Sequence, residues 1–94
     1  MIFHLPSALR RFAGDNEVVE LRLSHDARMT IGEAFVMLGR DHPAIRQRVL
    51  DDQNNIRRHV NVFVNGENVR FAQGGLTQVS NGCEVWIYPA LSGG

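Results

Sequence analysis

The chain ends in two glycines, Gly93 and Gly94, which place a main-chain carboxylate on a small, flexible unit. Such a carboxylate can be threaded into another enzyme and activated there. Glycine lacks Cβ and adopts almost any φ and ψ, so the pair passes through a channel too narrow for other residues. We therefore predict that the function of the protein resides at Gly94.

Chance is the alternative explanation of the glycine pair. With glycine at about 7% of positions, two terminal glycines occur in roughly one chain in two hundred, and engineered chains also end this way. The pair by itself is weak evidence, so its meaning depends on the fold that precedes it.

The other chemically active side chains form no catalytic or metal-binding pattern. Cys83 is the only cysteine, so no internal disulfide can form, and a zinc site would need clustered histidines instead. The four histidines are scattered along the chain, at His4, His25, His42 and His59. We expect no bound metal or cofactor, no catalytic residue, and a buried strand position for Cys83. The protein is thus predicted to be a carrier or substrate and not an enzyme.

Composition excludes several classes of protein. The 94 residues include 10 arginines, no lysine and 10 carboxylates, so the net charge is zero, whereas nucleic-acid binding requires clustered excess cations. No segment has the pattern of a targeting signal or a membrane span, and we expect a cytoplasmic protein without nucleic-acid or membrane partners. Because lysine is absent, an acyl group on Gly94 would find no ε-amine on its own chain.

The N-terminal residues predict two strands joined by a long connection. Residues 1–5 are apolar and stop at a proline, which suits a strand. Residues 8–12 suit a turn of helix, and the chain reverses at 14–16. Residues 17–23 then alternate between apolar and polar side chains, which predicts a second strand paired with the first.

Two helices are predicted next. Thr30 and Glu33 match a capping box, in which each side chain bonds the backbone amide of the other residue. The apolar residues behind this box recur at helical spacing, and Gly39 is a suitable stop, so this is the main helix. Pro43 then suits the first turn of a second, short helix over residues 44–50.

The C-terminal half returns to strands. Residues 60–64 alternate and precede Asn65-Gly66, a tight-turn signal, with a short return strand over residues 69–71. The last strand is predicted over residues 83–88. The whole order predicts an α+β fold, with a mixed sheet of about five strands wrapped around one main helix plus a short helix.

The chain therefore divides into a folded domain, residues 1–89, and a C-terminal tail, residues 90–94. Pro89 marks the boundary because it ends the last strand. At about 3.3 Å per extended residue, the tail spans roughly 16 Å, which is enough to enter a buried site in a partner.

Three aromatic rings are predicted to gather on the face of the sheet opposite the core. In the last strand Val85 and Ile87 point inward, so Trp86 and Tyr88 point outward, and alternation places Phe63 outward in the earlier strand. If the two strands are neighbours, the rings form an exposed patch that leads into the tail and serves as a partner-docking surface. A register shifted by one residue would bury all three.

Two segments, residues 60–70 (VNVFVNGENVR) and 87–94 (IYPALSGG), resemble the MoaD/ThiS family of small sulfur carriers. The resemblance covers essentially the whole chain and is most specific at Asn65-Gly66 and at the Pro-Ala-x-x-Gly-Gly end. It implies a ubiquitin-like β-grasp fold, as in the molybdopterin synthase small subunit and the sulfur carrier of a cysteine biosynthesis route.

The resemblance also implies that other proteins load and unload Gly94. An E1-like adenylyltransferase, using ATP with magnesium, would convert the carboxylate to an acyl adenylate. A sulfur donor protein would displace AMP and leave a thiocarboxylate, and a sulfur-accepting synthase would consume it. The residues that would thread into these partners with Gly94 are Ala90, Leu91, Ser92 and Gly93.

Two alternatives stay open. Gly94 could form isopeptide bonds with other proteins, as in a ubiquitin-like modifier, because both uses begin with the same adenylation. The chain could also be a β-grasp interaction module with an incidental glycine tail. For a sulfur carrier, the expected pathway is of the molybdopterin or the cysteine type.

Overall fold

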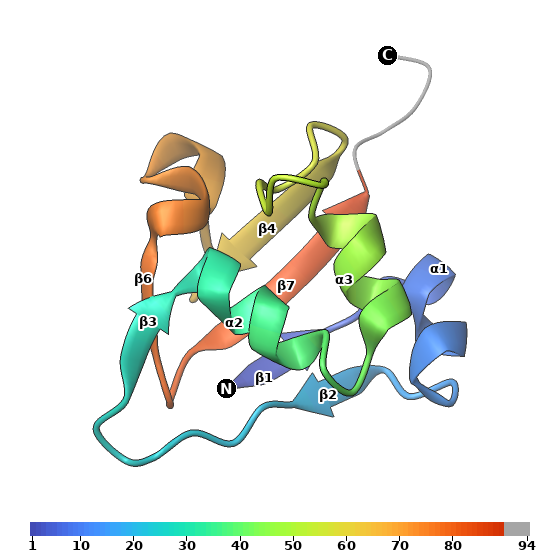
Figure 1. The fold of residues 1–94 in the computed structure, drawn as a ribbon, viewed down its shortest axis with the longest axis horizontal. Coiled ribbons are helices and arrows are strands. Elements are labelled where there is room, and N and C mark those ends of the chain that lie inside the picture. The colour runs from blue at the N-terminus through green and yellow to red at the C-terminus, as the bar shows by residue number, and fades with distance from the viewer. Residues whose placement is uncertain (90–94) are drawn as a thin grey trace.

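The computed structural model describes residues 1–89, which form a mixed five-stranded sheet with the main helices on one face (Figure 1). The strand order is β2-β1-β7-β4-β5. β1 and β7 run parallel, and the other neighbouring strands are antiparallel. The strands of this sheet are β1 Ile2–His4, β2 Val18–Glu20, β4 Val60–Val64, β5 Glu67–Asn68 and β7 Glu84–Pro89.

The structure contains a second, two-stranded sheet that the sequence did not predict. It consists of β3 (Arg28–Thr30) and β6 (Gln78–Ser80), which pair antiparallel with Met29 opposite Val79. Each strand has only three residues, too few for alternation to distinguish a strand from a loop. The predicted order of elements was wrong in leaving out these two strands.

The helices form where they were predicted. α1 (Ser7–Arg10) continues into the 3₁₀-helix η1 (Arg11–Ala13), and α2 (Ile31–Leu38) and α3 (Pro43–Val49) follow β3. α3 has Pro43 in its first turn, where the missing N–H is no loss. No helix in the described part of the chain is long and apolar enough to cross a membrane.

The predicted capping box begins α2. The Glu33 N–H donates to Thr30 Oγ1 at 3.1 Å, and the Thr30 N–H donates to Glu33 Oε1 at 2.9 Å. The backbone N–H of Thr30, and then its hydroxyl, hold the pKa of Glu33 below its usual value because both bonds favour the ionised carboxylate. The helix start is therefore fixed by reciprocal bonds, in which each side chain accepts from the backbone N–H of the other residue.

One local prediction needs correction. The return strand after Asn65-Gly66 is β5, at Glu67–Asn68, and the predicted segment 69–71 is instead a 3₁₀-helix, η2 (Val69–Phe71). Gly39 ends α2, as predicted, and does so in right-handed conformation (φ −65°). A Cβ there would lie 2.4 Å from Arg46 Cδ, so Gly39 provides space for α3 to pack.

The core lies between the sheet and the helices. Phe3 of β1 contacts Phe35 of α2, with ring centroids 5.3 Å apart. Val62 and Val85 are buried beneath them on β4 and β7. Burial of one sheet face leaves the other face open, and the side chains that alternate with the core residues lie there.

Candidate functional site

The open face of the sheet carries the three predicted aromatic rings. β4 and β7 are neighbours, with Phe63 opposite Trp86 and Asn61 opposite Tyr88. The inward residues of β7, Val85 and Ile87, are buried, so the register is the predicted one and not the shifted alternative. The rings of Phe63, Trp86 and Tyr88, named here the aromatic face, therefore lie on one side of adjacent strands.

The rings of the aromatic face contact one another. Phe63 meets Tyr88 edge to face, with centroids 5.7 Å apart and planes at 85°. Trp86 and Tyr88 are nearly parallel, with centroids 6.3 Å apart. Trp86 is 39% exposed and Tyr88 is 46% exposed, which is high for such large apolar side chains. This geometry suits a docking surface, and docking itself stays a prediction.

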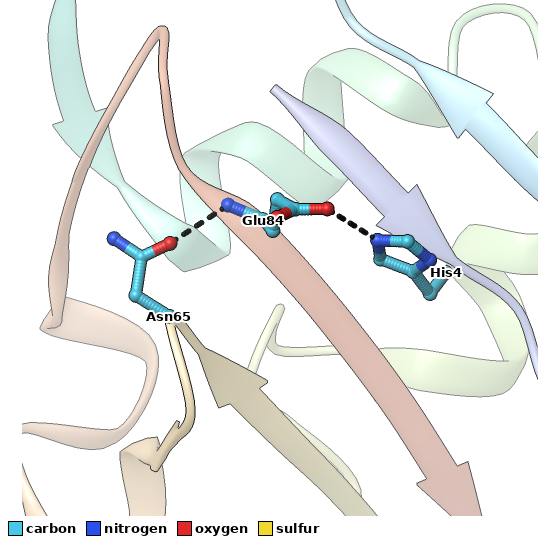
Figure 2. Close-up of polar contacts among 3 residues, drawn as sticks. All are labelled: His4, Asn65 and Glu84. Carbon is cyan, nitrogen blue, oxygen red and sulfur yellow. Dashed lines mark hydrogen bonds and ion pairs between the residues drawn. The ribbon is translucent and has the colours of Figure 1, made fainter.

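His4 extends the aromatic face across the sheet, and sequence reasoning missed it. β1 places His4 opposite Trp86, and the two rings stack with centroids 3.6 Å apart. His4 Nε2 lies 2.8 Å from Glu84 Oε1 (Figure 2). The signal that could have found His4 is its parity with Phe3, because a core residue at position 3 puts position 4 on the open face.

The Asn65-Gly66 turn fixes the start of β7. Asn65 and Gly66 both have positive φ, 50° and 88°, as a tight hairpin turn requires. The backbone N–H of Glu84 donates to Asn65 Oδ1 at 2.9 Å (Figure 2), and the Asn65 N–H donates to the Glu84 carbonyl at 2.9 Å. Glu84 is thus hydrogen-bonded to Asn65 through its backbone and to His4 through its side chain. These contacts link β1, β7 and the turn that follows β4, beside Trp86.

Cys83 is buried, as predicted, but it lies just before β7 and not within the strand, so the predicted start of the last strand was one residue too early. It is 8% exposed, and its Sγ accepts weak hydrogen bonds from Asn65 Nδ2 at 3.6 Å and from the Ser80 N–H at 3.4 Å. Within residues 1–89, no group of three or more histidines, cysteines or carboxylates lies close enough to hold a metal ion.

The predicted sulfur-carrying residue lies outside the described residues. β7 ends at Pro89, which is exposed and opposite Val60 of β4. The tail residues named as functional are Ala90, Leu91, Ser92, Gly93 and Gly94, and their predicted roles therefore stay predictions. The described structure shows the point from which they start.

The fold and the open face define a ubiquitin-like β-grasp protein, in which a mixed sheet wraps one main helix. The model of the ThiS family matches residues 4–94, and the chain belongs to that family. The family assignment and the fold class predicted from the sequence are both confirmed.

Relatives of the chain are carriers and modifiers. The sulfur carrier protein CysO of Mycobacterium tuberculosis (strain ATCC 25618 / H37Rv) is 34% identical over 92 residues, 96% of this chain and 94% of that protein. Small archaeal modifier protein 1 of Haloferax volcanii is 32% identical over 94 residues, 100% of both chains. The crystal structure of the Amycolatopsis orientalis BexX/CysO complex matches with a TM-score of 0.83 and 30% identity, over 99% of this chain and 98% of that chain.

Proposed function

We propose that the protein is a sulfur carrier that holds sulfur as a thiocarboxylate on Gly94. The observation that carries the proposal is the family match, which runs through the glycine pair to residue 94. The similarity to CysO over 96% of the chain supports it. The aromatic face beside Pro89 gives an activating partner a surface to hold while it receives the tail.

The chemistry belongs to the partners. A Gly94 carboxylate oxygen attacks the α-phosphorus of ATP in an E1-like adenylyltransferase, with magnesium on the nucleotide, and pyrophosphate leaves. A sulfide equivalent from a donor protein then attacks the acyl carbon, and AMP leaves. The resulting thiocarboxylate is a soft, ionised nucleophile that a sulfur-accepting synthase can use without free sulfide. The role of the chain is to present the acyl group.

The cysteine-type pathway is the favoured recipient, because CysO is among the most similar relatives. A molybdopterin-type pathway is the other sulfur-carrier assignment. The second candidate function is protein modification through Gly94, which the match to small archaeal modifier protein 1 over the full length of both chains supports. Adenylation of Gly94 is common to all of these assignments.

Intact-mass spectrometry tests the proposal. The chain is incubated with the adenylating enzyme of the same genome, ATP, magnesium and a sulfur donor, and a gain equal to replacing one oxygen by sulfur is expected at Gly94. Isopeptide conjugates to lysines of other proteins, without this gain, would instead support the modifier. Absence of both products and of ATP–pyrophosphate exchange would contradict both functions.

A further inference from the structure

A groove on the helical side of the fold lies next to the point where β7 ends. It has a volume of about 510 Å³ and lies between α1, α3, β4 and the end of β7, with Pro89 in its wall. Figure 1 shows α3 and α1 on the same side of the molecule as this end of β7. The buried residues at its base are apolar, among them Leu9, Val49 and Ile87.

The rim of the groove is cationic. Arg11, Arg48 and Arg57, which define the arginine groove, line it together with His59. Among residues 1–89, no aspartate or glutamate lines it. The protein as a whole has zero net charge, so this concentration of three guanidinium groups is a local asymmetry that composition alone does not reveal.

The guanidinium groups are held by neutral partners. Arg48 Cζ lies 4.0 Å and Arg11 Cζ 4.7 Å from the centroid of the Phe12 ring, so two cations contact one aromatic side chain. Arg48 Nη1 also donates to the Ala44 carbonyl at 3.2 Å, and Arg57 Nε donates to the Gln47 carbonyl at 2.9 Å. These contacts fix the positions of the guanidinium groups without neutralising them.

The close contacts between basic and acidic side chains in the described chain lie elsewhere. They are His4 with Glu84 and Arg22 with Glu20, both on other parts of the surface. Within residues 1–89, the three arginines of the groove have no carboxylate partner, and their remaining N–H groups are available to an acceptor. A planar guanidinium matches the geometry of a carboxylate, which can accept two parallel N–H bonds.

We infer that the arginine groove binds a segment bearing aspartate or glutamate on the adenylating enzyme, an inference that rests on the proposed function. An enzyme that receives the tail must approach Pro89, and Pro89 is part of the groove wall. The apolar base suits a peptide with side chains better than a bare phosphate. The partner then holds the chain at two surfaces, by apolar contacts at the aromatic face and by charge at the arginine groove.

A peptide titration tests the groove independently of enzyme activity. The ¹⁵N-labelled full chain is titrated with hexaglutamate, with hexaglutamine and inorganic phosphate as comparison ligands. We expect hexaglutamate alone to shift the Nε–Hε resonances of Arg48 and Arg57, and Arg48→Glu to abolish the shifts. Arg28→Glu is the matched control, because it changes the charge equally at an exposed position outside the groove.

Three outcomes of this titration would overturn the inference. Shifts spread evenly over all arginines would indicate nonspecific attraction, and equal shifts with phosphate would indicate an anion site only. Tighter peptide binding after deletion of residues 90–94 would indicate that the groove holds the chain's own tail.

Kinetics with the adenylating enzyme test the partner. In ATP–pyrophosphate exchange, Arg48→Glu should raise the KM for the chain about tenfold, leave kcat unchanged and weaken the dependence of KM on salt. Arg28→Glu should stay within about twofold of the parent chain. Equal KM values for the two variants would overturn the inference. If the parent chain itself gave no exchange, that result would count against the proposed function, and the peptide titration would then test whether the arginine groove binds an acidic segment.

Discussion

The imidazole of His4 stacks on the indole of Trp86, with ring centroids 3.6 Å apart and planes within 3° of parallel. The two residues are opposite each other in the parallel pair β1 and β7. Glu84 also holds His4, at 2.8 Å from Nε2. One side of the indole is therefore covered and its orientation is fixed before any partner arrives, which lowers the entropy lost on binding.

Trp86→Ala is expected to weaken docking far more than it weakens the fold. A central aromatic anchor typically contributes about 2 kcal/mol or more to an interface, so KM for the adenylating enzyme should rise roughly thirtyfold. The lost contacts with His4 and Tyr88 should lower the free energy of unfolding by about 1 kcal/mol. Exchange kinetics and urea denaturation measure the two effects separately.

Phe71→Ala is the matched control for Trp86→Ala. Phe71 is 83% exposed, but it lies in η2 and not on the open sheet face, so neither KM nor stability should change. An equal loss of docking in both variants would show that exposed aromatic area alone matters. Collapse of the Trp86→Ala fold would show that the indole is structural.

The outward direction of the three rings could be predicted from sequence because it depends only on parity, whereas the adjacency of their two strands was a condition that the structure supplies. β4 has five residues and β7 has six, and in each strand the aliphatic residues alternate with the others. Because successive side chains of a strand point to opposite faces, Val62 and Val85 on the core face place Phe63 and Trp86 on the open face. Alternation over that length is a strong signal. The capping box of α2 was equally visible, because Thr30 and Glu33 form a purely local pattern.

Features that depend on the meeting of distant segments could not be predicted. β3 and β6 are three residues each, and their pairing joins residues about fifty positions apart in the chain. The arginine groove needs Arg11 of η1 and Arg48 of α3 to meet at Phe12. In the sequence these arginines are scattered, and the balanced composition hides their proximity.

Asn65→Ala is expected to lower the free energy of unfolding by about 2 kcal/mol. It removes the acceptor for the Glu84 N–H, which is worth about 1 kcal/mol. It also leaves an alanine at φ 50°, and holding alanine in this left-handed conformation costs about 1 kcal/mol more. Urea denaturation of the variant measures the sum of the two terms.

Asn65→Gly and Asn65→Asp separate the two terms. Glycine adopts positive φ freely, so this variant should lose only the hydrogen bond and be about 1 kcal/mol more stable than the alanine variant. Aspartate keeps a carboxylate oxygen in place of Oδ1 and should retain most of the stability. If glycine is no better than alanine, backbone conformation is not part of the role of Asn65.

Glu33→Gln should be less stable than the parent chain at neutral pH but not in acid. The pKa of Glu33 is lower in the fold than its usual value of 4.5, so its ionised form stabilises the native state above that pH. As the pH falls below 4.5 and through the folded-state pKa, this stabilisation is lost in the parent chain alone. Melting temperatures of the two chains, measured across this range, should therefore converge; a constant difference would contradict the prediction.

Deletion of Gly94 should abolish sulfur loading and leave the fold unchanged. Residues 1–89 contain the complete sheet and core, so the melting temperature of the shortened chain should match that of the parent. The new terminal carboxylate would lie one residue short of the reacting phosphorus, about 3.3 Å along an extended chain, and misplacement on that scale stops in-line attack. Intact mass after incubation with the adenylating enzyme, ATP and a sulfur donor measures the loss, and Cys83→Ser is the companion variant that should load normally. Sulfur on the shortened chain, at Cys83 or elsewhere, would contradict a carrier that works through its terminal carboxylate.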